Sequence, residues 1–425
     1  MGFKTLIIGL DGVPCSVIKE LANKGVMPCI KDLMEQSIWG AMEVCLPPLS
    51  SVSWSSFMTA KNPADHGIYG FTDITPEYKL HFNSFLDIKT STLFDRLGEK
   101  GLRSVVINLP STYPTRSFPG VLISGFWSLE LKKSVYPSSL LPFLKEINYK
   151  VDIDLPRARE DAKYLFESLR DTLQMRKKVA EYLWDREEWN LFMLVVTGTD
   201  RLQHYQFKSL IHKEGIWHEE VMDYYREVDE LIEHYVNLFK SQGGDLVVIL
   251  SDHGFTELKK EVYINSLLEE KGFLKFKNKS PDFISELDPK NTVAFALDPA
   301  RIYVNLKDRF AEGIVSQKDF DKVRQQLQEL FDNLNFEGQK VVKMVKMKEE
   351  IYSGKLMDKA PDMVLVSEDG FDFKGAVNGA GVFRDSDLEG MHTFDNAFYL
   401  IHTKDNSVKP PKNIVELARF IEENY

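Results

Sequence analysis

Short apolar runs recur along the chain and alternate with longer amphipathic stretches. The clearest runs are rich in β-branched residues and lie at 5–10, 103–109, 191–197, 246–251, 362–367 and 397–402. Between them, stretches such as 160–186 and 218–241 place apolar residues three and four positions apart, which is typical of helices packed on a surface. This alternation predicts an α/β fold with a mostly parallel central sheet that is flanked by helices on both faces.

The segment 256–355 has a different pattern. It is rich in lysine and contains a predicted strand at 301–306, a predicted helix near 317–333 and a further short strand within 338–347. Because this segment falls between two predicted core strands, we interpret it as an inserted cap or subdomain. The core of the fold is then expected to comprise 1–255 and 356–425.

Acidic residues and histidines stand at the ends of several predicted strands. In open α/β sheets, ligands bind beyond the carboxyl ends of the strands, so polar residues at these positions are the first candidates for a site. The candidates are Asp11 after the first strand, Asp200 and His204 after 191–197, Asp252 and His253 after 246–251, and His392 just before the last strand.

Carboxylate oxygens and neutral imidazole nitrogens together indicate a site for zinc or a similar divalent ion. Asp200 and His204 are four residues apart, so on a helical turn they point the same way. Asp252 and His253 are adjacent and suit either a loop or a bridge between two ions.

Each of these candidates also has a purely structural interpretation when it is taken alone. Asp11 could cap a helix, Asp200 and His204 could be a solvated pair on a helix, and His392 could be an ordinary loop histidine.

The charge of the candidate site favours metal binding. Three buried carboxylates without partners would be very costly, whereas two divalent cations bring four positive charges. Three carboxylates and one deprotonated hydroxyl would balance them. The serine-rich stretch CLPPLSSVSWSSF (45–57) offers that hydroxyl, because Ser50 or Ser51 would open a helix, where free N–H groups stabilise an alkoxide or a phosphate.

The composition narrows the partners and the compartment. The formal net charge of −11 argues against binding to nucleic-acid polymers. No apolar run has the length of a membrane span, and the start MGFKTLIIGLDG does not fit a signal peptide, so a cytoplasmic location is expected. Cys15, Cys29 and Cys45 are expected to be reduced thiols.

Five motifs occur in a fixed order along nearly the whole chain: GLDG (9–12), PPLSSVSWSSFMTAKNPADHGIYGF (47–71), TDRLQH (199–204), SDHGF (251–255) and GMH (390–392). Together they resemble the alkaline phosphatase superfamily, in its type I phosphodiesterase and nucleotide pyrophosphatase branch. The pattern is similar to that of predicted phosphohydrolases of this branch in archaea and bacteria. The resemblance implies an alkaline-phosphatase-like sheet with an inserted cap.

The resemblance also implies roles for the candidate residues. One zinc would be held by Asp200, His204 and His392, and a second by Asp11, Asp252, His253 and the nucleophile. Counted back from HGI (66–68), the nucleophile falls on Ser50, with Ser51 as the alternative because Val52 stands where the family has proline. Zinc is the expected ion, with manganese or magnesium as alternatives. No substrate-binding residue is assigned.

The reaction implied is hydrolysis of a phosphodiester or pyrophosphate bond in a phosphorylated small molecule such as a nucleotide, by way of a phosphoserine. A phosphomonoesterase or metal-dependent phosphomutase on the same core is an alternative, with Arg301, Arg309 and Arg384 as candidate phosphate or carboxylate ligands. A non-catalytic metal- or phosphate-binding protein is another. A sulfatase is disfavoured, since CLPPL (45–49) lacks the arginine of the sulfatase motif.

Overall fold

The computed structural model describes residues 2–213, 215–278, 284–377, 381–405 and 407–425. The chain divides into two compact units. The core unit comprises Met1–Lys61, Ser84–Thr256 and His392–Tyr425, and the second unit comprises Asn62–Asn83 and Glu257–Met391. None of the described helices is both long and apolar enough to cross a membrane.

The core unit is built on an eight-stranded sheet with the strand order β2-β21-β9-β1-β8-β5-β6-β7. Strands β9, β1, β8, β5 and β6 run parallel to one another. β21 is antiparallel to β9 and β2, and β7 is antiparallel to β6, so the predicted mostly parallel sheet is confirmed. The strand bounds are β1 Thr5–Leu10, β2 Ile38–Met42, β5 Ser104–Leu109, β6 Gly120–Ser124, β7 Val135–Tyr136, β8 Leu191–Val196, β9 Leu246–Leu250 and β21 Ala397–Thr403.

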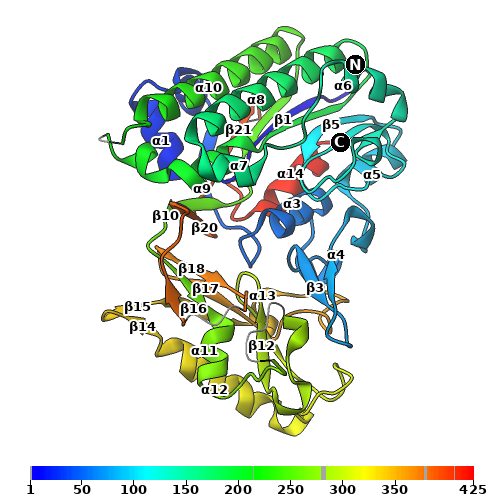
Figure 1. Ribbon diagram of the computed structural model, residues 1–425. Helices are drawn as coiled ribbons and strands as arrows, with labels where there is room; N and C mark the ends of the chain where they lie inside the picture. Colours follow the sequence, from blue (N-terminus) through cyan, green and yellow to red (C-terminus); the bar gives the residue numbers. More distant parts are fainter. Residues whose placement is uncertain (1, 214, 279–283, 378–380, 406) are drawn as a thin grey trace. The chain divides into compact units, whose positions relative to one another are not determined.

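Helices cover both faces of this sheet (Figure 1). Strand β1 shows why: Leu6 and Ile8 belong to one apolar cluster and Ile7 to another, because successive side chains of a strand point to opposite faces. The first face is covered by α1 Cys15–Asn23, α2 Pro28–Met34, α8 Ala162–Trp184, α9 Gly198–Ile211 and α10 His218–Ser241, and the other by α3 Ser50–Thr59, α5 Leu93–Glu99 and α14 Ile414–Glu423.

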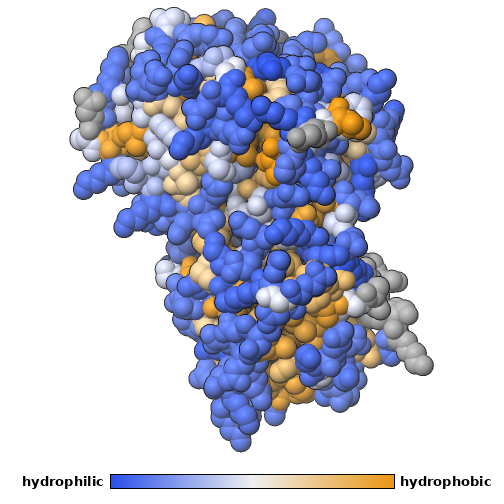
Figure 2. Space-filling view, turned by 90° about the vertical axis from the view of Figure 1, so that its left-hand side faces the viewer, coloured by the Kyte–Doolittle hydropathy of each residue, from blue (hydrophilic) through white to orange (hydrophobic). Residues whose placement is uncertain are grey.

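The outer surface of the core unit is mainly polar. Hydrophilic side chains predominate on the face of this unit that Figure 2 shows, as expected when the apolar stripes of the helices point inward.

The shorter helices of the unit are α6 Leu141–Glu146 and α7 Leu155–Glu160. Strands β10 Gly254–Glu257 and β20 Gly390–Thr393 lie where the chain leaves the core unit and returns to it.

The second unit has smaller sheets. Its four-stranded sheet has the order β12-β13-β17-β16 with antiparallel neighbours, and a three-stranded sheet has the order β18-β11-β19. The elements are β3 Thr72–Ile74, β4 Leu80–Phe82, β11 Lys260–Tyr263, β12 Ala294–Leu297, β13 Arg301–Val304, β14 Asn335–Phe336, β15 Gln339–Lys340, β16 Val342–Met347, β17 Met363–Ser367, β18 Phe371–Lys374, β19 Phe383–Arg384, α4 Pro63–His66, α11 Ile264–Glu270, α12 Phe320–Asp332 and α13 Lys348–Ile351.

One strand prediction is wrong in its placement. The run 362–367 was expected in the central sheet, but it forms β17, which pairs with β13 and β16 in the second unit. A short, fully apolar run shows that a strand is buried on both faces, yet it does not show in which sheet the strand lies.

The extent of the second unit also differs from the predicted insertion at 256–355. It continues to Met391 and takes in Asn62–Asn83. Long-range contacts explain the second difference: the Tyr78 hydroxyl donates to Asn305 Oδ1 at 2.8 Å, and Arg301 pairs with Asp73 at 3.3 Å. That this unit acts as a cap stays a prediction.

Candidate metal centre

The strand order of the core unit brings the predicted ligands together. Strands β9, β1 and β8 are neighbours, and each leads at its carboxyl end to an acidic residue: Asp252, Asp11 and Asp200 respectively. His392 lies in β20, shortly before β21 returns to the sheet. Because parallel strands end at the same edge, these side chains meet there.

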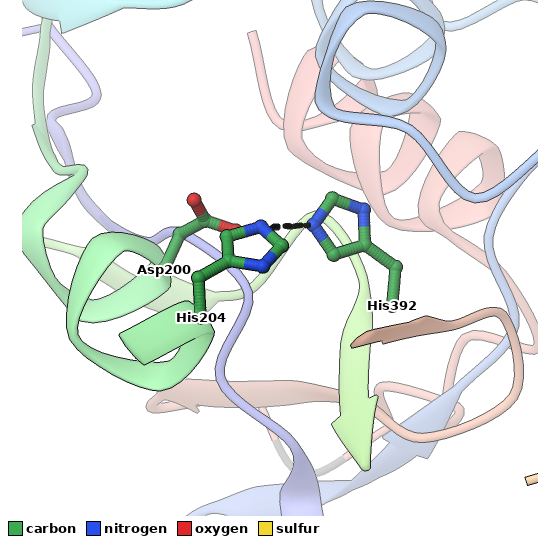
Figure 3. Close-up of side chains that lie close together, drawn as sticks. All are labelled: Asp200, His204 and His392. Atoms are coloured by element: carbon green, nitrogen blue, oxygen red, sulfur yellow. Dashed lines mark hydrogen bonds and ion pairs between the residues drawn. The ribbon is translucent and has the colours of Figure 1, made fainter. Parts of the chain in front are cut away.

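Asp200, His204 and His392 form one cluster, here termed the Asp200 group (Figure 3). Their ligand atoms lie within 4.8 Å of one another. The Nε2 atoms of His392 and His204 are 3.2 Å and 3.5 Å from Asp200 Oδ1, and 3.1 Å from each other. Asp200 Oδ1 is buried and accepts no hydrogen bond among the described residues. Three electron-pair donors that converge in this way suit a cation.

Asp11, Asp252 and His253 form a second cluster, the Asp11 group. All three side chains are fully buried. His253 Nε2 is 3.4 Å from Asp252 Oδ2 and 3.7 Å from Asp11 Oδ1. Asp252 Oδ2 likewise accepts no hydrogen bond from the part of the chain that the structure describes.

Backbone carbonyls orient two of the histidines for metal binding. His253 Nδ1 lies 3.1 Å from Gly254 O, and His392 Nδ1 lies 3.1 Å from Pro48 O. A ring nitrogen that donates its proton to a carbonyl leaves the opposite nitrogen with a free electron pair. In both rings that opposite nitrogen is Nε2, which faces the carboxylates.

The two groups are parts of one centre. The rings of His253 and His392 stack with their centroids 3.7 Å apart, and His253 Nε2 is 3.9 Å from Asp200 Oδ1. The donor atoms of both groups therefore suit two neighbouring cations rather than two unrelated sites.

The pKa shifts reflect the crowding of negative charge. Burial, together with the charges of Asp252 and Asp200, raises the pKa of Asp11 well above its ordinary value, and burial raises the pKa of Asp252 to about 7. Burial acts in the same direction on Asp200, but His204, His392 and Arg201 outweigh it and hold its pKa well below the ordinary value. Burial also lowers the pKa of His253, which keeps the ring neutral.

The residues thus fit a pair of divalent cations. Among the described residues, two buried carboxylate oxygens lack a hydrogen-bond donor, and imidazole nitrogens stand beside them. Oxygen and nitrogen donors in this mixture are those that zinc binds in proteins, although the same set also accepts manganese.

Ser50 reaches the centre and Ser51 does not. Ser50 is the first residue of α3, and its Oγ lies 3.2 Å from His253 Nε2 and 3.4 Å from Asp11 Oδ1. The Ser51 hydroxyl is buried and has no hydrogen-bond partner among the described residues. The geometry therefore favours Ser50 over Ser51 as the nucleophile.

Trp54 connects α3 to the centre, a contact that the sequence did not reveal. Its Nε1 donates to Asp11 Oδ2 at 3.2 Å. This approach requires Gly9 in β1, because a Cβ at that position would lie 2.8 Å from the Trp54 ring. The paired occurrence of GLDG and a helical tryptophan is the only signal that could have indicated it.

Arg201 is a second residue that the sequence prediction missed. It follows Asp200 directly, and its Nη1 donates to Asp200 Oδ2 at 2.7 Å. A basic residue next to an aspartate that is predicted to bind metal was the available signal.

The three arginines proposed for a phosphomutase or monoesterase make contacts within the second unit, where Arg384 lies over the ring of Tyr263 at 3.7 Å. Arg301 is fully buried and donates to Asp298 O at 2.8 Å, and Arg309 donates to Ala360 O at 2.9 Å.

Burial raises the pKa of the Cys45 thiol to about 11, so a reactive thiolate at this position is disfavoured.

Comparison with known protein families matches residues 5–395 to type I phosphodiesterase / nucleotide pyrophosphatase. The chain belongs to this family. It is accordingly a hydrolase of a metal-dependent family whose members typically use two metal ions, and this chain has two candidate groups of metal-binding residues. A search of curated proteins found no match.

Solved structures share the fold of this phosphodiesterase-family chain. Phosphonoacetate hydrolase from Sinorhizobium meliloti 1021, in complex with phosphonoformate, is 16% identical, with a TM-score of 0.65 and coverage of 99% of this chain and 95% of that one. Murine ectonucleotide pyrophosphatase/phosphodiesterase 5 is 15% identical, with a TM-score of 0.59 and coverage of 98% and 94%. These similarities establish an alkaline-phosphatase-like fold.

Proposed function

We propose that the protein hydrolyses phosphodiester or pyrophosphate bonds in small phosphorylated molecules, with two zinc ions bound and with Ser50 as the nucleophile. The observation that carries this proposal is the position of Ser50 Oγ, 3.2 Å from His253 Nε2 and 3.4 Å from Asp11 Oδ1, at the first residue of α3. A hydroxyl at this point faces both the candidate ligands and the positive end of a helix.

The proposed roles of the ligands follow the two clusters. Asp200, His204 and His392 would hold one ion, and Asp11, Asp252, His253 and Ser50 the other. When bound, such ions lower the pKa of a coordinated hydroxyl and neutralise the charge of a phosphoryl group.

The chain itself supplies the nucleophile and its surroundings. The Ser50 hydroxyl gives up its proton to solvent, its oxygen bonds to phosphorus, and the bond from phosphorus to the leaving oxygen breaks. The leaving oxygen takes up a proton from solvent, so the products are a phosphoserine and the free leaving group. The first N–H groups of α3, which no side chain caps, would donate hydrogen bonds to the phosphoryl oxygens. Water then attacks the same phosphorus, and the Ser50 oxygen leaves and regains a proton.

A nucleotide or another small phosphate ester is the expected substrate class. One similar structure, an inactive form of the murine protein at 15% identity, is a complex with AMP, and another contains phosphonoformate. Both ligands are small anions with a phosphoryl or phosphonyl group, which supports this choice of class. The identity of the metal and a cytoplasmic location stay predictions.

Metal analysis and a substrate comparison test this function. The purified protein is analysed for bound metal, stripped with a chelator, and reloaded with zinc, manganese or magnesium. Each form is assayed with bis-p-nitrophenyl phosphate, p-nitrophenyl phosphate and a nucleoside diphosphate. We expect two ions per chain, loss of activity on stripping, recovery with zinc, and faster cleavage of the diester than of the monoester. Preference for the monoester would instead favour a phosphomonoesterase, and absence of both metal and activity would favour a binding protein.

A further inference from the structure

The three carboxylates of the centre share one arrangement: each has one oxygen held by a protein donor, while its other oxygen faces the cluster. The donors are Trp54 Nε1 for Asp11 Oδ2 at 3.2 Å, the Gly12 N–H for Asp252 Oδ1 at 2.9 Å, and Arg201 Nη1 for Asp200 Oδ2 at 2.7 Å. The oxygens left over are those that approach the histidines.

Arg201 is the only charged donor of these three. Its side chain is 11% exposed and also contacts Asp152, with Nη2 2.7 Å and Nε 3.2 Å from Asp152 Oδ2. The guanidinium lies over the ring of Phe126 at 4.4 Å. A guanidinium that is fixed on two sides by a carboxylate and an aromatic ring has little freedom to leave Asp200.

Asp152 is itself held in place by α8. Arg176 in this helix is buried, donates to Lys150 O at 2.6 Å and to Val151 O, and lies over the Tyr149 ring at 4.7 Å. The loop that carries Asp152 is therefore fixed to the core of the unit. A continuous series of polar contacts runs from α8 through this loop and Arg201 to Asp200.

Coordination chemistry indicates what this series of contacts would do for metal binding by Asp200. A catalytic zinc site uses three protein donors and keeps a fourth position for substrate or water, whereas calcium takes six to eight oxygens and often a bidentate carboxylate. If Asp200 offered both oxygens, the group would supply four donors and fill the open position.

We infer that Arg201 is a positioning residue that restricts Asp200 to one metal-binding oxygen, and that Asp152 fixes Arg201 for this task. The pair thereby sets both the affinity of the Asp200 group and its preference for zinc over ions that take more oxygen ligands. This inference rests on the proposed function, because it takes the Asp200 group to be a metal site.

Metal binding to the full-length protein tests the inference without an activity assay. Zinc and magnesium affinities of the metal-free protein are measured by competition with a chromophoric chelator, for the wild type and for Arg201→Gln, Arg201→Lys and Asp152→Asn. Arg170→Gln is the matched control: Arg170 also pairs with two carboxylates, those of Glu220 and Glu227, at 2.7 Å each, but it lies on α8, whereas Arg201 lies on α9.

The expected result is selective. Arg201→Gln lowers the affinity for one of the two zinc ions by about 10- to 100-fold, as is usual when a metal ligand loses its hydrogen-bond partner. The affinity for the other ion stays nearly unchanged. The preference for zinc over magnesium falls as well. Asp152→Asn shows a smaller change in the same direction, Arg201→Lys recovers part of the affinity, and Arg170→Gln binds both ions as the wild type does.

Several outcomes would overturn the inference. If Arg201→Gln and Asp152→Asn keep wild-type affinity for both ions and an unchanged zinc preference, Arg201 has no positioning role, although the proposed function stands. If Arg201→Gln binds neither ion and its circular-dichroism spectrum shows that it is unfolded, the result for Asp152→Asn is used instead. Wild-type zinc binding by Asp152→Asn then rejects the inference. A wild-type protein that binds no metal rejects the proposed function and this inference with it.

Discussion

Two buried carboxylates in the core unit make opposite use of their oxygens. Asp229 in α10 lies against the start of α2, where its two oxygens accept the N–H groups of Cys29 and Ile30 at 2.8 Å and 3.0 Å. Asp252 at the end of β9 accepts one N–H, that of Gly12, and its Oδ2 has no donor among the described residues. Burial raises the pKa of both, to about 6 for Asp229 and about 7 for Asp252.

The difference shows that burial and a raised pKa do not by themselves mark a functional carboxylate. Asp229 caps a helix whose own preceding residue, Met27, provides no side-chain cap, so both of its oxygens are used in folding. Asp252 keeps one oxygen unused by the fold. The unsatisfied oxygen, next to a neutral imidazole, is what distinguishes the candidate metal centre from a structural contact.

The largest expected effect concerns the hydroxyl that completes the centre. Ser50→Ala should lower kcat by about 10³-fold or more, because it removes the proposed nucleophile, while two ions remain bound. Steady-state kinetics with bis-p-nitrophenyl phosphate and metal analysis measure both quantities. Ser51→Ala is the matched control and should stay within about threefold of the wild type, since its hydroxyl touches no ligand. The reverse ranking of the two variants would assign the nucleophile to Ser51.

Asp252→Asn should have the second-largest effect on activity. The amide can still accept the Gly12 N–H through its oxygen, but its NH₂ group then faces the cluster and cannot bind a cation. We expect bound zinc to fall from two ions to about one and kcat to fall by about 10²-fold or more. Retention of two tightly bound ions would show that Oδ2 is not a ligand.

Asp229→Asn is the structural counterpart of that substitution. One of the two N–H groups at the start of α2 loses its acceptor, which should lower the free energy of unfolding by about 1–3 kcal/mol at pH 5. Metal content and kcat should not change. Urea unfolding and metal analysis of the same preparation separate the two effects, and a loss of zinc in this variant would remove the contrast with Asp252.

The smallest expected effect is the pH dependence of the difference in free energy of unfolding between the wild type and Asp229→Asn. Burial raises the pKa of Asp229 to about 6, above the value in an unfolded chain, so its contribution to stability is complete at low pH and is lost as the pH rises through about 6. The advantage of the wild type over Asp229→Asn should therefore shrink between pH 5 and pH 8. An advantage that grows over this range would mean that the folded protein lowers the pKa of Asp229.

The sequence was sufficient to predict the class of fold, the strands β1, β5, β8, β9 and β21 of the central sheet, and the edge at which the candidate ligands lie. The apolar runs of β1, β8 and β9 each end at an acidic residue, and parallel strands place their carboxyl ends at one edge, so Asp11, Asp200 and Asp252 had to converge if those strands were neighbours. The predicted start of a helix left Ser50 and Ser51 as alternatives for the hydroxyl, and the family resemblance favoured Ser50.

Other features depend on contacts between distant segments, which periodicity does not encode. β17 has the same apolar pattern as a central strand but pairs in the second unit. Asp152 is 49 residues from Arg201, and its role becomes visible only when α8 has positioned its loop. The Trp54 N–H was hidden because tryptophan on a buried helix face is interpreted first as packing.

The position of β21 in the sheet has a consequence for synthesis of the protein on the ribosome. β21 lies between β2 and β9, and β2, made within the first fifty residues, borders only β21 in the described sheet. In the nascent chain, β2 therefore cannot form its native strand pairing until β21, which ends at Thr403, has emerged. His392 emerges just before β21, so the Asp200 group gains its third ligand in the same interval in which the sheet closes. The candidate metal centre therefore lacks one of its predicted ligands until this late stage of synthesis.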